Sequence, residues 1–223
     1  MAGMDPRSVC AMVLAGGMGS RMGGVDKGLQ LLRGRALAWH CVERLLAQTG
    51  GAPGMIALNA NRSKDIYESW GHPVWADALQ GFAGPLAGFH TGLQHCAPEP
   101  GATPRGPAFG HLLTVACDTP RFPLDLLQRL SEALDQAQAD IAVAAAPERG
   151  SDGSMFLRTQ PVFCLMRTEL GGSLTAFLAA GGRKVDAWTA QHRTVTVAFD
   201  QEQDDPMAFF NANTLAELAQ LNA

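Results

Sequence analysis

The segment from Leu14 to Lys27 is the part of this sequence best suited to chemistry. It reads LAGGMGSRMGGVDK and holds five glycines together with two cations, Arg21 and Lys27. Glycines allow backbone torsions that other residues resist, and they let the chain lie directly against a ligand. Amide groups in such a loop can point at phosphate oxygens, and the two cations suit a polyphosphate. The segment therefore predicts a phosphate-binding loop, with an incidental flexible loop as the alternative.

Two familiar phosphate motifs do not describe this loop. The P-loop needs Gly-Lys-Ser/Thr at the start of a helix, whereas Lys27 stands between Asp26 and Gly28. The dinucleotide fingerprint needs a different glycine spacing and an acidic residue at the end of the second strand. The loop is therefore interpreted as a nucleotide-binding loop of another class.

A carboxylate, Asp118, follows the apolar run from His111 to Ala116. This run is mostly apolar after its first residue, which predicts a central strand covered on both faces. The carboxyl ends of parallel strands form the ligand-binding edge of such a sheet. A carboxylate there can hold Mg²⁺, which keeps water and phosphate oxygens as its other ligands. Asp118 could instead cap the helix that follows Pro120.

Short apolar runs alternate with amphipathic segments along the chain, which is typical of βαβ units around a mainly parallel sheet. The expected strands are Val9 to Leu14, Met55 to Leu58, Pro73 to Trp75, His111 to Ala116, Ile141 to Ala146, Pro161 to Met166 and Val195 to Phe199. The expected helices are Ala36 to Gln48, Ser63 to Trp70, Pro85 to Gln94, Pro123 to Gln136, Leu174 to Ala180 and Thr214 to Leu221. The segment from Ala97 to Gly110, rich in proline and glycine, is expected to be a surface loop. The predicted fold class is α/β, a three-layer α/β/α sandwich with a Rossmann-like nucleotide-binding sheet.

Composition narrows the class of protein. A chain of 223 residues with 47% hydrophobic residues predicts one globular domain, and a net charge of -4 argues against binding nucleic acid by charge. The apolar runs are far shorter than the roughly 20 residues of a membrane span, and the N-terminus offers no secretory signal. Five scattered cysteines without a CxxC pair, and histidines without an HxxxH pair, favour a cytoplasmic protein with neither a disulfide framework nor a zinc site. A monomer is expected, since no long exposed apolar stripe is evident.

Several segments together resemble one known family. Leu14-Ala-Gly-Gly and Arg21-Met-Gly-Gly-x-Asp-Lys-Gly-Leu29 resemble the signature loop of the molybdenum cofactor guanylyltransferases, which belong to the nucleotidyltransferase superfamily and have a Rossmann-like fold. Further matches are Asn59-Ala-Asn-Arg62 with Ile66-Tyr67, Asp77, Gly84-Pro-Leu-Ala-Gly88, Cys117-Asp-Thr-Pro120 and Phe210-Asn-Ala-Asn213-Thr-Leu-Ala-Glu217-Leu218. The likeness spans nearly the whole chain, with the loop from Ala97 to Gly110 outside it.

The resemblance implies an activity. GMP would pass from GTP to the terminal phosphate of molybdopterin-bound molybdenum cofactor, giving the guanine dinucleotide form and pyrophosphate. GTP and the molybdenum cofactor are the implied substrates, Mg²⁺ is the implied cofactor, and cofactor-insertion proteins and target molybdoenzymes are the implied recipients. Residues 1–223 would form one nucleotidyltransferase domain, with 1–120 mainly binding GTP and Mg²⁺ and 121–223 mainly binding the cofactor substrate.

The resemblance also implies roles for individual residues. The implied GTP-binding residues are Leu14, Ala15, Gly16, Gly17, Lys27, Asn59, Asp77 and Asp118. Lys27, Arg21 and Asp118 would be catalytic, and Asp118 would be the magnesium ligand. Asn59 and Asp77 could instead be turn residues. Asn211 and Asn213 would either approach the second substrate or cap the last helix.

One departure and three alternative functions stay open. Gln160-Pro161 stands where this family is expected to carry His-Pro, and a glutamine side chain cannot carry the charge of an imidazole. The alternatives are a CTP-dependent cytidylyltransferase acting on the same cofactor, a sugar-phosphate nucleotidyltransferase, and a non-catalytic module that delivers cofactor. Leu14-Ala-Gly-Gly favours guanine, because the CTP-dependent relatives more often resemble Leu-Ala-Ala-Gly at this place.

Overall fold

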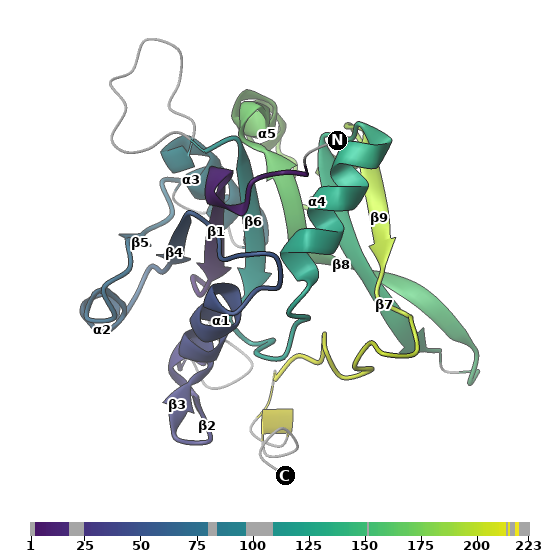
Figure 1. Cartoon of the computed structure of the whole chain (residues 1–223). Coiled ribbons are helices and arrows are strands. Elements are labelled where there is room, and N and C mark those ends of the chain that lie inside the picture. The colour runs from purple at the N-terminus through teal and green to yellow at the C-terminus, as the bar shows by residue number, and fades with distance from the viewer. Residues whose placement is uncertain are drawn as a thin grey trace.

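The computed structural model describes residues 3–17, 25–79, 84–96, 109–150, 152–212, 214 and 217–218. These residues form a seven-stranded sheet in the order β5-β4-β1-β6-β8-β7-β9 (Figure 1). The strands are β1 Val9–Leu14, β4 Met55–Asn59, β5 Val74–Trp75, β6 His111–Ala116, β7 Ile141–Arg149, β8 Met155–Arg167 and β9 Thr194–Ala198. A separate two-stranded ribbon is formed by β2 Leu31–Leu32 and β3 Arg35–Ala36.

The sheet is mainly parallel, as predicted. β1 runs parallel to β4 and to β6, and β7 runs parallel to β9. β8 is antiparallel to both of its neighbours, β6 and β7. All the described strands of this sheet except β8 therefore end at the same edge, where ligands bind in open α/β sheets.

Helices cover both faces of the sheet and make three layers (Figure 1). The helices are α1 Leu37–Leu46, α2 Lys64–Glu68, α3 Pro85–Cys96, α4 Leu126–Ala137, α5 Gly171–Ala179 and α6 Val185–Thr189. Side chains of β1 alternate between the faces: Val9, Ala11 and Val13 pack with α1 and α4, whereas Cys10 and Met12 pack with α3, α5 and α6. The predicted α/β/α sandwich is confirmed. In the part of the chain described here, no helix has the length and apolar character needed to cross a bilayer.

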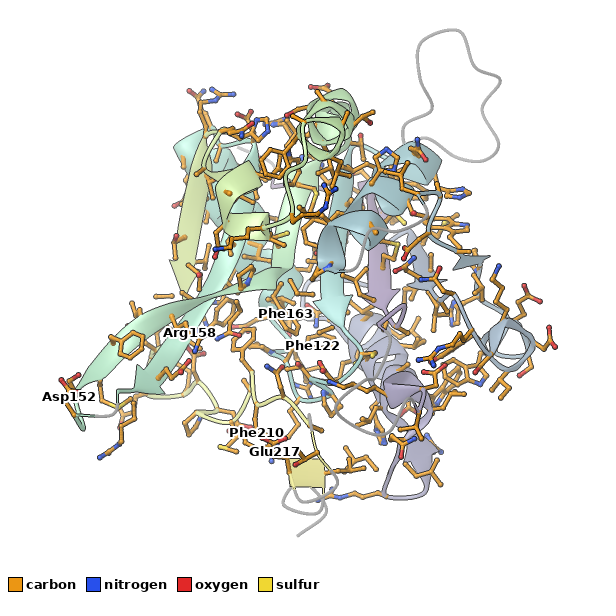
Figure 2. All side chains as sticks on the ribbon, turned by 180° about the vertical axis from the view of Figure 1, so that it is seen from behind. Phe122, Asp152, Arg158, Phe163, Phe210 and Glu217 are labelled. Atoms are coloured by element: carbon orange, nitrogen blue, oxygen red, sulfur yellow. The ribbon has the colours of Figure 1, made fainter. Side chains whose placement is uncertain are left out.

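The largest difference from the sequence prediction is an arm formed by the ends of β7 and β8. We expected β7 to end at Ala146 and β8 to begin at Pro161, but Ala145–Arg149 pair with Met155–Thr159 after a register shift in the ladder. The arm projects beyond the body of the molecule, with Asp152 near its tip and Arg158 along it (Figure 2). Its Met155, Phe156 and Leu157 are 58%, 47% and 48% exposed. Cross-strand pairing stabilises this ribbon without burial on one face, so hydrophobic alternation gave no sign of it.

One helix of the structure is absent from the sequence prediction, and two predicted segments lie mostly outside the described residues. The short helix α6 was not predicted. The predicted helix from Thr214 to Leu221 and the predicted loop from Ala97 to Gly110 lie mostly outside the described residues. Thr214 does show the hydrogen bonds of a helix start, since its Oγ1 accepts from the Glu217 backbone N–H at 3.1 Å.

Candidate active site

Three neighbouring strands end in register at the carboxyl edge of the sheet. Leu14 of β1 pairs with Asn59 of β4 and with Ala116 of β6. Backbone hydrogen bonds continue beyond the strands, from Ala15 N–H to the Asn59 carbonyl at 2.8 Å and from Cys117 N–H to the Leu14 carbonyl at 3.2 Å. The glycine loop and the turn carrying Asp118 therefore begin side by side, as the sequence predicted.

Lys27 and Asp118 form an ion pair across 91 residues of sequence. Lys27 Nζ lies 3.4 Å from Asp118 Oδ2, and the two side chains are 21% and 18% exposed. Lys27, the predicted phosphate-binding cation, and Asp118, the predicted metal ligand, are thus in contact and both partly buried. Because they are screened from bulk water, their charges act more strongly on a bound anion than exposed charges would.

The donors around Asp118 fit Mg²⁺ bound partly by a nucleotide. Among the described residues, no group of three or more His, Cys, Asp or Glu side chains could form a complete protein cage for a metal. Magnesium is usually held by one or two carboxylates together with substrate phosphates and water. A single carboxylate beside a phosphate-binding loop matches that preference.

Asp77 and Asn59 meet at the same edge. Asn59 is buried, and its Nδ2 donates to the Trp75 carbonyl at 3.1 Å and to Asp77 Oδ1 at 2.9 Å. The other Asp77 oxygen, Oδ2, accepts from Asn61 Nδ2 at 2.7 Å, and the Asp77 N–H donates to Asn61 Oδ1 at 2.8 Å. Asn61 was not among the predicted site residues, although its place two residues after Asn59 put it on the same stretch of chain. The Asp77 carboxylate is held in one orientation by two neutral amides.

Two glycines enclose the Asn59 side chain. A Cβ atom on Gly16 would lie 3.0 Å from Asn59 Oδ1, and one on Gly88 would lie 2.7 Å from the same oxygen. The Gly16 carbonyl accepts from Asn61 Nδ2 at 3.3 Å, and the Gly17 carbonyl accepts from Arg62 Nη2 at 3.1 Å. The first part of the glycine loop is therefore tied to the segment after β4, and glycine at position 16 allows a close approach to Asn59 that a Cβ atom would make tight.

The turn carrying Asp118 is contacted by helix α1 and by the C-terminal segment. Cys41 of α1 points its thiol at the Ala116 carbonyl at 3.4 Å, and burial raises the pKa of this thiol, so it stays protonated. Thr119 Oγ1 donates to Asn211 Oδ1, and the Ala212 N–H donates to the Asp118 carbonyl at 2.8 Å. Asn211 thus holds the turn, a role the sequence did not predict, because it depends on contact between segments 92 residues apart.

Two predicted site residues, Arg21 and Asn213, lie outside the described residues. Cys117 is buried, as expected of a small apolar residue, and burial raises the pKa of its thiol. Gln160 lies in the half-buried part of β8, between the arm and the sheet.

Comparison with known proteins gives the family. A family model described as the MobA-like NTP transferase domain matches residues 11–223. The chain belongs to the MobA-like NTP transferase family. Among MobA-like relatives, the molybdenum cofactor guanylyltransferase of Albidiferax ferrireducens is 57% identical, with 96% of each chain covered. That of Bordetella pertussis is 48% identical and covers 99% of this chain and 100% of its own. The resemblance stated from the sequence is confirmed.

Solved structures of MobA-like and related proteins confirm the fold. The molybdopterin-guanine dinucleotide biosynthesis protein A of Archaeoglobus fulgidus superposes with a TM-score of 0.68 at 19% identity, covering 96% of both chains. The 4-diphosphocytidyl-2C-methyl-D-erythritol synthase of Anaerococcus prevotii superposes with a TM-score of 0.66 at 14% identity, covering 98% of this chain and 96% of its own. At such identities the likeness concerns the fold alone, and that fold is the nucleotidyltransferase fold.

Proposed function

We propose that this chain transfers GMP from GTP to the terminal phosphate of molybdopterin-bound molybdenum cofactor, with release of pyrophosphate. The observation that carries the proposal is the half-buried Lys27–Asp118 pair at 3.4 Å, placed where the glycine loop leaves β1. The identity of the transferred group and of the acceptor is proposed from the names of the relatives, which are molybdenum cofactor guanylyltransferases.

The reaction needs alignment and charge neutralisation more than proton transfer. An oxygen of the cofactor's phosphate monoester attacks the α-phosphorus of GTP, and the bond from that phosphorus to the β-phosphate oxygen breaks. The attacking oxygen is already anionic, so no general base is required. Lys27 neutralises charge on the phosphates, and Arg21 is proposed as a second cation. Asp118 is the carboxylate that would hold Mg²⁺, which, when bound, supplies positive charge to the phosphate oxygens.

Guanine recognition is assigned to Asp77 together with the backbone of Leu14, Ala15, Gly16 and Gly17. Guanine presents two neighbouring N–H donors on one edge, and a fixed carboxylate has acceptor positions for both. Asn59 and Asn61 hold the carboxylate in place without a positive charge. Cytosine lacks this pair of donors, so the arrangement favours GTP over CTP.

The proposed GTP-binding residues all lie in 1–120, and the cofactor substrate is assigned mainly to 121–223. We propose one cytoplasmic monomer as the working unit, which passes its product to cofactor-insertion proteins and target molybdoenzymes.

Calorimetry with GTP, CTP, ATP and UTP in the presence of Mg²⁺ tests the proposal. We expect selective binding of GTP, weaker binding by Lys27→Ala, and loss of pyrophosphate release by Asp118→Ala with the cofactor substrate present. Preference for CTP would move the chain to the cytidylyltransferases. GTP binding without pyrophosphate release by the wild type would indicate a delivery module, and near-normal turnover in either variant would remove the role assigned to that residue.

A further inference from the structure

Asp26 fixes the turn from which Lys27 extends. Lys27 begins the short 3-10 segment Lys27–Leu29, and Asp26 is its N-cap residue. Asp26 Oδ1 accepts from the Gly28 N–H at 3.1 Å. A capping side chain stabilises the first turn by accepting one of its backbone N–H groups. The conformation of the turn that carries Lys27 therefore depends on where this carboxylate is held.

Tyr67 holds the same carboxylate oxygen from another element. The Tyr67 hydroxyl, in α2, donates to Asp26 Oδ1 at 2.7 Å, and the Tyr67 side chain is fully buried. Burial and the contact with Asp26 raise the pKa of the phenol, so it remains a donor. The transfer reaction proposed above does not use this buried hydroxyl.

The turn also rests directly on the tyrosine. A Cβ atom on Gly28 would collide with the Tyr67 hydroxyl, and it would lie 3.2 Å from the Ala38 Cβ. The Tyr67 ring packs edge to face against Trp70, with centroids 5.0 Å apart, and Trp70 packs against Trp39 of α1 at 5.4 Å. The phenol of Tyr67 is therefore fixed by packing. Position 28, next to its hydroxyl, has room for glycine but not for a residue with a Cβ atom.

We propose that Tyr67 is a positioning residue for Lys27. Its hydroxyl fixes the Asp26 carboxylate, which fixes the turn that directs the Lys27 ammonium toward Asp118. The proposal rests on the proposed function, in which that ammonium meets the phosphates of GTP. A loosely held ammonium still attracts GTP through its charge, but it no longer matches the charge that develops on the leaving pyrophosphate. The loss of Tyr67 should therefore lower kcat more than it raises KM for GTP.

The first experiment compares Tyr67→Phe with Thr168→Val. Thr168 donates a buried hydrogen bond to the Phe109 carbonyl at 2.8 Å, so Thr168→Val removes a comparable bond away from Lys27. We expect Tyr67→Phe to lower kcat about tenfold, the scale of one hydrogen bond to a charged group, with KM for GTP changed less than about twofold. Thr168→Val should leave both constants near those of the wild type. Equal effects of the two variants on kcat would overturn the proposal.

The second experiment does not depend on turnover. Amide hydrogen exchange at Gly28, followed by NMR, should accelerate in Tyr67→Phe and stay unchanged in Thr168→Val. Unchanged exchange in Tyr67→Phe, or faster exchange with an unchanged kcat, would each sink the positioning role. An inactive wild type would count against the proposed function instead.

A third variant covers the case in which Tyr67→Phe does not fold. Asp26→Ser keeps a capping oxygen for Gly28 but is too short to reach the Tyr67 hydroxyl. It should reproduce the same fall in kcat with little change in KM, and a wild-type kcat in this variant would contradict the proposal.

Discussion

At the scale of single residues, the Asp77 carboxylate is held in place by hydrogen bonds to two side chains. Among the described residues, the side chains that hydrogen-bond to it are those of Asn59 and Asn61, and both are uncharged amides. Such a carboxylate keeps its negative charge available for donors on a ligand. The proposed recognition of guanine therefore depends on charge as well as on shape.

We predict that Asp77→Asn lowers the preference for GTP over inosine triphosphate, which lacks the 2-amino donor. A well-formed pair of hydrogen bonds to a base is worth about 1–3 kcal/mol, so the ratio of the two affinities should fall by roughly tenfold or more. Calorimetry with both nucleotides checks this. Asp65→Asn, a change in an exposed carboxylate of α2, serves as the control. An unchanged ratio in Asp77→Asn would show that the base is recognised elsewhere.

Sequence reasoning identified the residues whose chemistry is visible in their type. The glycine loop, which ends at Lys27, and Asp118 were expected at the same edge of the sheet, because each follows a strand of a parallel sheet. The structure places the Lys27 ammonium 3.4 Å from the Asp118 carboxylate. Asn61, Tyr67 and Asn211 were not given their roles. Each acts through a contact with a segment distant in sequence, and neither periodicity nor motif spacing carries that information.

At the scale of elements, the turn after β6 is docked against the C-terminal segment. Thr119→Val removes the donor to Asn211 with little change in shape. We predict a loss of about 1 kcal/mol in the free energy of unfolding and faster amide exchange at Ala212, whose N–H donates to the Asp118 carbonyl. Urea unfolding and hydrogen exchange measure these two effects. Wild-type exchange at Ala212 would mean that the segment is held by other contacts.

The elements themselves were predicted best where burial is complete. β1 and β6 match the predicted bounds residue for residue, because runs buried on both faces are continuous in sequence. β8 was predicted six residues too short at the end that enters the arm: it spans 13 residues, of which only the later part is buried. The exposed part of β8 lacks the alternation of buried and exposed residues from which a strand is predicted.

The two parts of β8 should respond differently to substitution. Leu165 is fully buried in the body of the sheet, and Leu157 is 48% exposed in the arm. We predict that Leu165→Ala costs about 2–5 kcal/mol in the free energy of unfolding, whereas Leu157→Ala costs under about 0.5 kcal/mol. Urea denaturation of both variants provides the test, and comparable costs would show that the arm belongs to the cooperative core.

At the scale of the whole molecule, His111 links stability to pH. Burial lowers the pKa of this imidazole below its ordinary value, and the positive charge of Arg167, its partner on the neighbouring strand β8, lowers it further. Among the described residues, neither of its ring nitrogens has a hydrogen-bond partner. As the pH falls below about 6.5, the unfolded chain binds a proton at His111 before the folded chain does. Stability should therefore decrease on acidification in that window.

We predict that His111→Gln reduces this pH dependence. Unfolding in urea at pH 7.5 and at pH 5.5 should show a smaller decrease for the variant than for the wild type. Because other groups titrate in both proteins, the difference between the two decreases isolates the contribution of His111. Equal decreases would mean that His111 takes up its proton equally well in the folded state.

Tyr67 is the single tyrosine of the sequence, and this gives the protein a built-in optical probe. Ionised tyrosine absorbs ultraviolet light at longer wavelength than the neutral phenol, so every tyrosinate signal must come from this one side chain. Its raised pKa and its hydrogen bond to Asp26 keep it neutral until the contact opens. After a jump to alkaline pH, the rate at which the tyrosinate band appears therefore measures how often the Lys27 turn opens, and Tyr67→Phe supplies a spectroscopic blank.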